Sequence, residues 1–101
     1  MPNPMQQMLA QAQRMQREMQ KAQAALKEKE FSVSKSGMVE LTMTGDMKVK
    51  KLSIDPDALE EDNKEMLEEA IQMAFEEVLS KIAEEKEEME ERITGQTGFP
   101  F

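Results

Sequence analysis

Apolar positions in the first thirty residues recur with the spacing of a long amphipathic helix. The intervals alternate between three and four residues over three heptads, at Met5, Met8, Ala12, Met15, Met19, Ala22 and Leu26. An apolar seam of this kind behind Pro4 predicts a helix over residues 4–27, which would be about 35 Å long. Methionine and alanine make the seam thin and adaptable. Two interpretations stay open: the helix packs on its own sheet, or it shares the seam with a helix of another subunit.

The middle of the chain alternates apolar and polar residues with the period of β-strands. This alternation predicts strands over 30–35, 38–44 and 47–54, with a hairpin signal at Gly45-Asp46. The phase slips at Lys50-Lys51, which indicates a β-bulge. We therefore expect three antiparallel strands with one apolar face, which helices must cover.

The last part of the chain is helical and acidic. Asp55 and Pro56 favour the start of a short helix over 56–61, and a second, long helix is expected over 63–93. Its apolar stripe runs through Leu67, Ile71, Phe75, Val78 and Ile82. Beyond that stripe, the run EEKEEMEE has little to bury, so it is expected to project into water or to touch a partner only with Met89 and Ile93.

Residues 95–101 hold two Gly, one Pro and two Phe, and carry no charged side chain. A flexible tail is one expectation for this stretch. Docking of Phe99 and Phe101 into a groove, for instance on a neighbouring subunit, is the other.

These elements predict a single α+β domain over residues 1–94. It consists of a long N-terminal helix, a three-stranded antiparallel sheet, a short helix and a long C-terminal helix. Only 39% of the chain is hydrophobic, and it has no Trp or Tyr. A lone chain of this composition builds a thin core, which favours burial against a second copy in a homodimer.

Several classes of function lack the residues they need. The chain has no Cys and no His, so it has no disulfide and lacks the commonest general base and transition-metal ligand. It carries no P-loop, EF-hand loop or Gly-x-Gly-x-x-Gly motif. We interpret the many carboxylates as a solvated face. Acid–base catalysis needs a pocket that gives two carboxyl groups different pKa values, and the sequence shows no sign of one. We expect no enzyme activity, metal, cofactor or small-molecule substrate.

The sequence also favours a cytoplasmic protein. The opening residues show no basic region followed by an apolar one, so no signal peptide is expected, and no apolar run approaches a membrane span. The first helix lacks Trp and Phe, which makes binding to a membrane surface unattractive.

The net charge of −8 hides a division of the chain. Residues 1–30 carry a net +2, residues 31–54 another +2, and residues 55–101 a net −12. Such asymmetry can point to an anionic partner on the basic side.

The basic residues of the first helix lie opposite its apolar seam. Arg14, Arg17 and Lys21 fall on one outward face, and Gln13 and Gln20 share that side. They form either an ordinary solvated surface or a stripe that contacts phosphates, with Gln adding hydrogen bonds without repulsion. A second group in the sheet either extends the basic surface or only protects an edge strand from aggregation: Lys48, Lys50 and Lys51.

Two segments resemble the YbaB/EbfC family of bacterial nucleoid-associated proteins. They are MLAQAQRMQREMQ and SIDPDALEEDNKEMLEEAIQMAFEEV, and the resemblance covers nearly the whole chain in order. It implies an interlocked homodimer with protruding helical arms. It further implies binding of double-stranded DNA with little sequence preference, in the bacterial nucleoid, with a role in chromosome organisation and gene regulation.

The resemblance makes Arg14, Arg17 and Lys21 the best candidates for phosphate contact. Family members often carry Asn just after the Phe that matches Phe75, with basic residues a turn later. Here that stretch contains Glu76, Glu77, Ser80 and Lys81, of which only Lys81 keeps the basic character.

The alternative is a protein–protein interaction or scaffold module. Its Met-rich seam and acidic arm would dock other proteins, with incidental or no DNA binding. A charge of about −16 per dimer, twice the net charge of the chain, favours this reading over a DNA binder.

Overall fold

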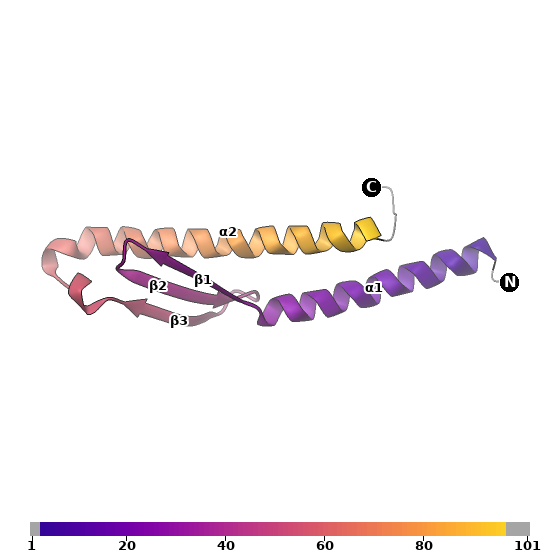
Figure 1. Cartoon of the computed structure of the whole chain (residues 1–101), viewed down its shortest axis with the longest axis horizontal. Coiled ribbons are helices and arrows are strands. Elements are labelled where there is room, and N and C mark those ends of the chain that lie inside the picture. The colour runs from indigo at the N-terminus through magenta and orange to yellow at the C-terminus, as the bar shows by residue number, and fades with distance from the viewer. Residues whose placement is uncertain (1–2, 97–101) are drawn as a thin grey trace.

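The structure, a computed structural model, describes residues 3–96. Its elements follow the chain as α1 (Pro4–Glu28), β1 (Glu30–Lys35), β2 (Val39–Thr44), β3 (Val49–Ile54), the 3₁₀ turns η1 (Pro56–Ala58) and η2 (Glu61–Asn63), and α2 (Lys64–Gln96). The fold is α+β, as the sequence predicts (Figure 1). The molecule is elongated, with extents of 74 × 22 × 13 Å.

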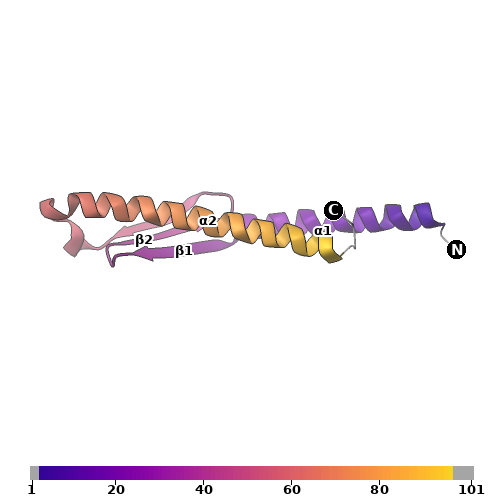
Figure 2. The ribbon, with the colours of Figure 1, turned by 90° about the horizontal axis from the view of Figure 1, so that it is seen from above.

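α1 begins with a capping box. The backbone N–H of Gln6 donates to Oδ1 of Asn3 over 2.7 Å, and Oε1 of Gln6 accepts from the Asn3 N–H over 3.3 Å. Pro4 follows at the first helical position, where its missing donor costs nothing. The helix buries no residue completely. Its N-terminal end extends past the end of α2 in both views (Figures 1 and 2).

The sheet has the order β1-β2-β3 and is antiparallel throughout. α2 packs on β1 and β2, and its small residues let the helix approach the strands closely. The core consists of Phe31, Val33, Val39, Leu41 and Met43 from the sheet and Ala70, Ala74, Val78 and Ile82 from α2. β3 lies outside this cover, so its apolar Val49 and Leu52 are 48% and 45% exposed.

The predicted bulge lies in β3. Thr42 pairs with Lys51, and the next residue, Met43, pairs with Val49, which leaves Lys50 as the extra residue. β3 begins at Val49 rather than at residue 47, because Met47 has a left-handed backbone with φ 66°.

The predicted helix over 56–61 is two separate 3₁₀ turns. Asp55 caps the first turn as expected, since its side chain accepts from the Asp57 N–H over 2.9 Å. Leu59, with φ −84° and ψ 59°, then leaves helical geometry and interrupts the segment.

α2 continues through Gly95 to Gln96, past the predicted end at residue 93. Gly95 and Gln96 therefore belong to the helix rather than to a tail. The Thr94 hydroxyl donates back to the Glu90 carbonyl over 3.0 Å. Phe99 and Phe101 lie outside the described residues.

The acidic half of α2 lies against α1 of the same chain. Met89 and Ile93 are buried, and Ala22 and Leu26 of α1 line a pocket together with Met89. The apolar seam of α1 is thus partly covered within one chain. Its first heptad is not: the seam residues Met5 and Met8 are 78% and 66% exposed.

Truncation of Leu41 to Ala tests this core. Leu41 is fully buried between β2 and α2, so the change should lower the free energy of unfolding by about 3 kcal/mol in urea denaturation. Leu9→Ala removes the same atoms from a side chain that is 59% exposed, and should cost less than about 1 kcal/mol. Equal losses for the two variants would contradict the placement of the core.

Candidate nucleic-acid interface

The outer face of α1 carries three exposed cations. Arg14, Arg17 and Lys21 are exposed along the helix, and so are Gln13 and Gln20. The half-buried residues of α1 lie on the other side, along the apolar seam: Ala12, Met15, Glu18, Met19, Ala22 and Leu26. The rise per residue puts Arg14 and Lys21 about 10 Å apart along the axis. We call Arg14, Arg17, Lys21, Gln13 and Gln20 the α1 stripe.

Most lysines outside α1 are paired with a carboxylate. The ion pairs within residues 3–96 are Lys29–Glu85, Lys35–Glu77, Lys48–Asp46, Lys50–Glu30, Lys51–Glu40, Lys64–Glu68 and Lys81–Glu77. In the same part of the chain, Arg14, Arg17, Lys21 and Lys27 of α1 form no ion pair. Lys86 and Arg92 of α2 do not either, but they stand among glutamates. The positive charge of α1 is therefore the least neutralised at close range.

Lys81 lies away from the α1 stripe and is paired with a carboxylate. Its Nζ lies 3.9 Å from Glu77 Oε1, and Glu77 also pairs with Lys35. Lys35 ends β1, at the end of the strand remote from α1 (Figure 1). The structure therefore does not bring Lys81 together with Arg14, Arg17 and Lys21.

Two carboxyl groups of the body have a lowered pKa. The hydrogen bond from Lys35 is the main cause of the lowered pKa of Glu77. Desolvation opposes it, and the charges of Lys35 and Lys81 add smaller effects in the lowering direction. The hydroxyl of Thr44 lowers the pKa of Asp46 in the β2–β3 hairpin, and Lys48 adds to this. Both carboxylates are held in the charged form by their partners.

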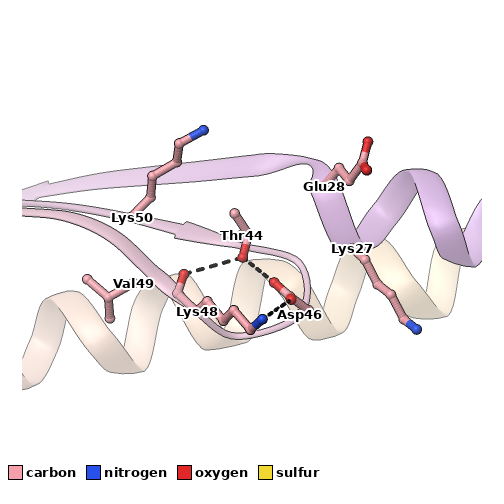
Figure 3. Close-up of a pocket in the computed structure, with 7 residues that line it drawn as sticks. All are labelled: Lys27, Glu28, Thr44, Asp46, Lys48, Val49 and Lys50. Atoms are coloured by element: carbon pink, nitrogen blue, oxygen red, sulfur yellow. Dashed lines mark hydrogen bonds and ion pairs between the residues drawn. The ribbon is translucent and has the colours of Figure 1, made fainter.

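Lys48 of the β2–β3 hairpin and Lys50 of β3 line an open pocket of about 530 Å³ at the end of α1, together with Lys27 (Figure 3). Lys48 Nζ turns to Asp46 Oδ2 at 3.6 Å. Lys27 and Lys50 point to opposite sides of the pocket (Figure 3). The cations of this pocket therefore do not converge on one point, and they do not form a discrete anion site.

The second group of lysines, which consists of Lys48, Lys50 and Lys51, is paired throughout. Lys50 Nζ lies 3.3 Å from Glu30 Oε2, and Lys51 Nζ lies 3.5 Å from Glu40 Oε1 across the neighbouring strand. Exposed pairs of this kind are weak, so the three lysines remain accessible to a stronger anion. The carboxylate partners, however, offset the positive charge of the three lysines.

Sequence reasoning did not single out Lys27. This residue is exposed in the last turn of α1 and has no ion pair among the described residues. A lysine at this position is explained locally by the helix dipole, so nothing in the sequence linked it to Lys48 and Lys50. Only the fold places it beside them.

Other kinds of site find no support in the described part of the chain. Within residues 3–96 no three acidic side chains converge to hold a metal ion. No helix in this range has both the length and the apolar character needed to cross a bilayer.

Comparison with known proteins confirms the resemblance seen in the sequence. A model of the YbaB/EbfC DNA-binding family matches residues 1–97, which include every helix and strand described above. A nucleoid-associated protein of Lachnospira eligens is 46% identical over 77 residues, which cover 75% of this chain and 66% of that protein. One from Enterococcus faecalis is 41% identical over 97 residues, covering 94% of this chain and 93% of the relative. One from Rickettsia canadensis is 40% identical over 82 residues, covering 80% and 77%.

The pairing of Glu77 predicts its titration. Followed by NMR, Glu77 should titrate below the usual pKa of a glutamate, and Lys35→Met should raise this pKa more than Lys81→Met, because Lys35 is the main cause of the shift. Since the pKa is lower in the folded state, the stabilisation is present above the pKa of the unfolded chain and is lost as pH falls through the folded value. Lys64→Met, which breaks the separate pair with Glu68, serves as control. A parent Glu77 that titrates at the usual value would contradict the pairing.

Proposed function

We propose that this chain, which belongs to the YbaB/EbfC DNA-binding family, binds double-stranded DNA as a homodimer. It does so mostly through phosphates and with little sequence preference. In this role it acts on the bacterial nucleoid and contributes to chromosome organisation and gene regulation. Relatives named nucleoid-associated proteins, at 40–46% identity, support the same assignment.

The observation that carries the proposal is the unpaired state of the α1 stripe. Arg14, Arg17 and Lys21 are exposed and form no ion pair within residues 3–96, whereas the lysines of the sheet are all paired. A phosphate that meets the α1 stripe displaces solvent and counterions, but it need not break an existing ion pair. Gln13 and Gln20 add long hydrogen-bonding side chains that tolerate any base sequence.

The position of the acidic charges on α2 is compatible with DNA binding by a protein of net charge −8. The run over 84–91 contains six glutamates and lies on the side of α1 away from the stripe, since the seam between them faces α2. Charges further apart than the Debye length, about 8 Å at physiological salt, are largely screened. The acidic helix therefore repels a duplex from its own side and leaves the outer face of α1 for approach.

Two uncovered apolar surfaces support the homodimer. On the body, Val49 and Leu52 of β3 are exposed, and so are Met66 and Met73 of α2. On the arm, the first heptad of the seam extends past α2 without cover. A second copy offers the same surfaces in return, as a two-fold interface requires, and adds to a core that is thin in one chain.

The dimer predicts a mass of two chains, each 11.6 kDa. Light scattering coupled to gel filtration at micromolar concentration should show this mass, and the melting temperature should rise with protein concentration, because association is linked to folding. Leu52→Glu, which puts a charge on the uncovered face of β3, should lower the association. A single-chain mass with a melting temperature independent of concentration would rule the dimer out.

A scaffold module is the second candidate function. It is favoured by the exposed Met5, Met8, Met47, Met66 and Met73, because flexible thioether side chains suit several protein partners. The two candidates differ in their response to salt. A protein that binds no duplex at about 50 mM salt is a scaffold rather than a DNA binder.

Charge reversal on α1 tests DNA binding directly. Replacement of Arg14, Arg17 and Lys21 together by Glu should abolish binding of a fluorescent duplex in anisotropy measurements. Six such side chains per dimer, if all contact phosphate, give the parent a log–log salt slope of about −5. Circular dichroism should be unchanged, because the three side chains are exposed and unpaired within residues 3–96.

The matched control is reversal of Lys48, Lys50 and Lys51 to Glu. It changes the net charge by the same amount at a different place, where each lysine already faces a carboxylate. It should weaken binding less than the α1 variant does. Equal losses in the two triple variants would mean that total charge, rather than the α1 stripe, decides binding.

A further inference from the structure

The backbone of the β2–β3 hairpin contacts the C-terminal end of α1, residues 26–29, which we call the foot of α1. The N–H of Gly45 donates to the carbonyl of Lys29 over 2.9 Å. A Cβ at residue 45 would overlap the carbonyl oxygen of Leu26 and lie 2.7 Å from its carbonyl carbon. The first contact is to the residue that caps α1 and the second is to the last turn of the helix, so the hairpin and the helix meet here backbone to backbone.

Gly45 is required by this contact rather than by its own backbone angles. Its φ lies outside the left-handed range, whereas Gly37 in the preceding hairpin has φ +67°. The left-handed position of the β2–β3 hairpin is held by Met47, with φ 66°. Any residue could adopt the backbone conformation of Gly45, but only glycine leaves room for the carbonyl of Leu26.

Lys29 ties the same point to the rest of the body. Its N–H donates to the carbonyls of Ala25 and Leu26, which closes α1. Its ammonium group forms the ion pair with Glu85 of α2 and lies 5.5 Å from the centre of the Phe31 ring in β1. The residue that ends the arm is thus held by the hairpin, by α2 and by the sheet.

The direction of α1 depends on this foot. Arg14 lies 15 residues before Lys29, about 22 Å along the helix, while Leu26 lies only about 4.5 Å away. A tilt that moves Leu26 slightly therefore moves Arg14 about five times as far. Further along, Met15, Met19 and Ala22 of α1 are half-buried on the side of the seam, and methionine side chains adapt to such a tilt instead of resisting it.

We propose that Gly45 is a positioning residue, which sets the direction of α1 and thereby places the α1 stripe for DNA. The inference rests on the proposed function for the DNA part, and on the contacts of the foot alone for the direction of the arm. Gly45→Ala is the test, because its methyl group must push the hairpin and α1 apart. Gly95→Ala is the matched control, since a Cβ there meets nothing within 4 Å.

The chain has no cysteine, so spin labels can be placed freely. Ala10→Cys on α1 and Ser80→Cys on α2 are both exposed, and their distance in the full chain, diluted with unlabelled protein, reports the direction of the arm. Ser53→Cys with Ser80→Cys reports the body alone. In Gly45→Ala the first distance should shift by several ångströms and the second should stay unchanged. Gly95→Ala should alter neither.

The same variants are then titrated against a duplex. Gly45→Ala should raise the Kd about threefold to tenfold and make the salt slope shallower by about 1 to 2, because a misdirected arm loses phosphate contacts. A merely structural role of Gly45 would lower the melting temperature without changing the salt slope.

A second pair of variants loosens the foot without adding an atom. Glu85→Gln breaks the ion pair with Lys29, and Glu84→Gln removes the same charge from the neighbouring exposed position. Both reduce repulsion of DNA equally. Glu85→Gln should nevertheless bind DNA more weakly than Glu84→Gln and show a broader distribution of the Ala10–Ser80 distance.

The outcomes separate this inference from the proposed function. An unchanged Ala10–Ser80 distance in Gly45→Ala overturns the positioning role, and so does a variant that fails to fold, since Gly45 would then be needed by the body itself. A shifted arm with unchanged DNA affinity also overturns it. If the parent binds no duplex, the proposed function fails and the DNA part of the inference with it, while the distances still decide what directs α1.

Discussion

One helix covers the apolar face of a three-stranded sheet, and most of the architecture follows from this constraint. α2 packs on β1 and β2, where the small side chains of Ala70 and Ala74 bring it close to Leu41. A single helix is about 10 Å wide, so it cannot also cover β3, and Val49 and Leu52 remain exposed. The core is closed along α2 and open along β3. α1 packs against this core with Leu26 of its last turn, and its N-terminal part extends past α2 as an arm.

The ion pairs follow the same division. Lysines on the sheet pair with carboxylates of another strand, of the hairpin or of α2. Individually such exposed pairs contribute little to stability. Within residues 3–96, the cations that form no ion pair are those of α1 and, on the acidic α2, Lys86 and Arg92. The lysines of the sheet are thus neutralised by carboxylates, whereas the positive charges of α1 stay unpaired on the surface where DNA is proposed to bind.

Local periodicity predicted the faces of the elements but not what covers each face. The alternation of residues 47–54 was enough to find the bulge at Lys50, and the heptads of α1 correctly separated Arg14 from the seam. The contact of Met89 with α1 depends on how the chain returns on itself, which no spacing records. The interruption at Leu59 is a matter of one residue's backbone angles, within a segment whose composition suits a helix. The partners of Lys50 and Lys51 likewise come from the arrangement of the strands in the sheet.

The position of glycine in the β2–β3 hairpin shows which requirement is stronger. A left-handed residue other than glycine costs about 1 to 2 kcal/mol, and the hairpin accepts this cost at Met47, held by hydrogen bonds of 2.9 Å from its N–H to Thr44 and from the Thr44 N–H to Lys48. An exchange of the two residues would relieve Met47 but put a side chain against the backbone of Leu26. Backbone strain of this size leaves the elements in place, whereas overlap with a helix carbonyl is relieved only when the helix moves. The hairpin therefore has its glycine where α1 is seated, and the strain at Met47 is a consequence of fixing the arm.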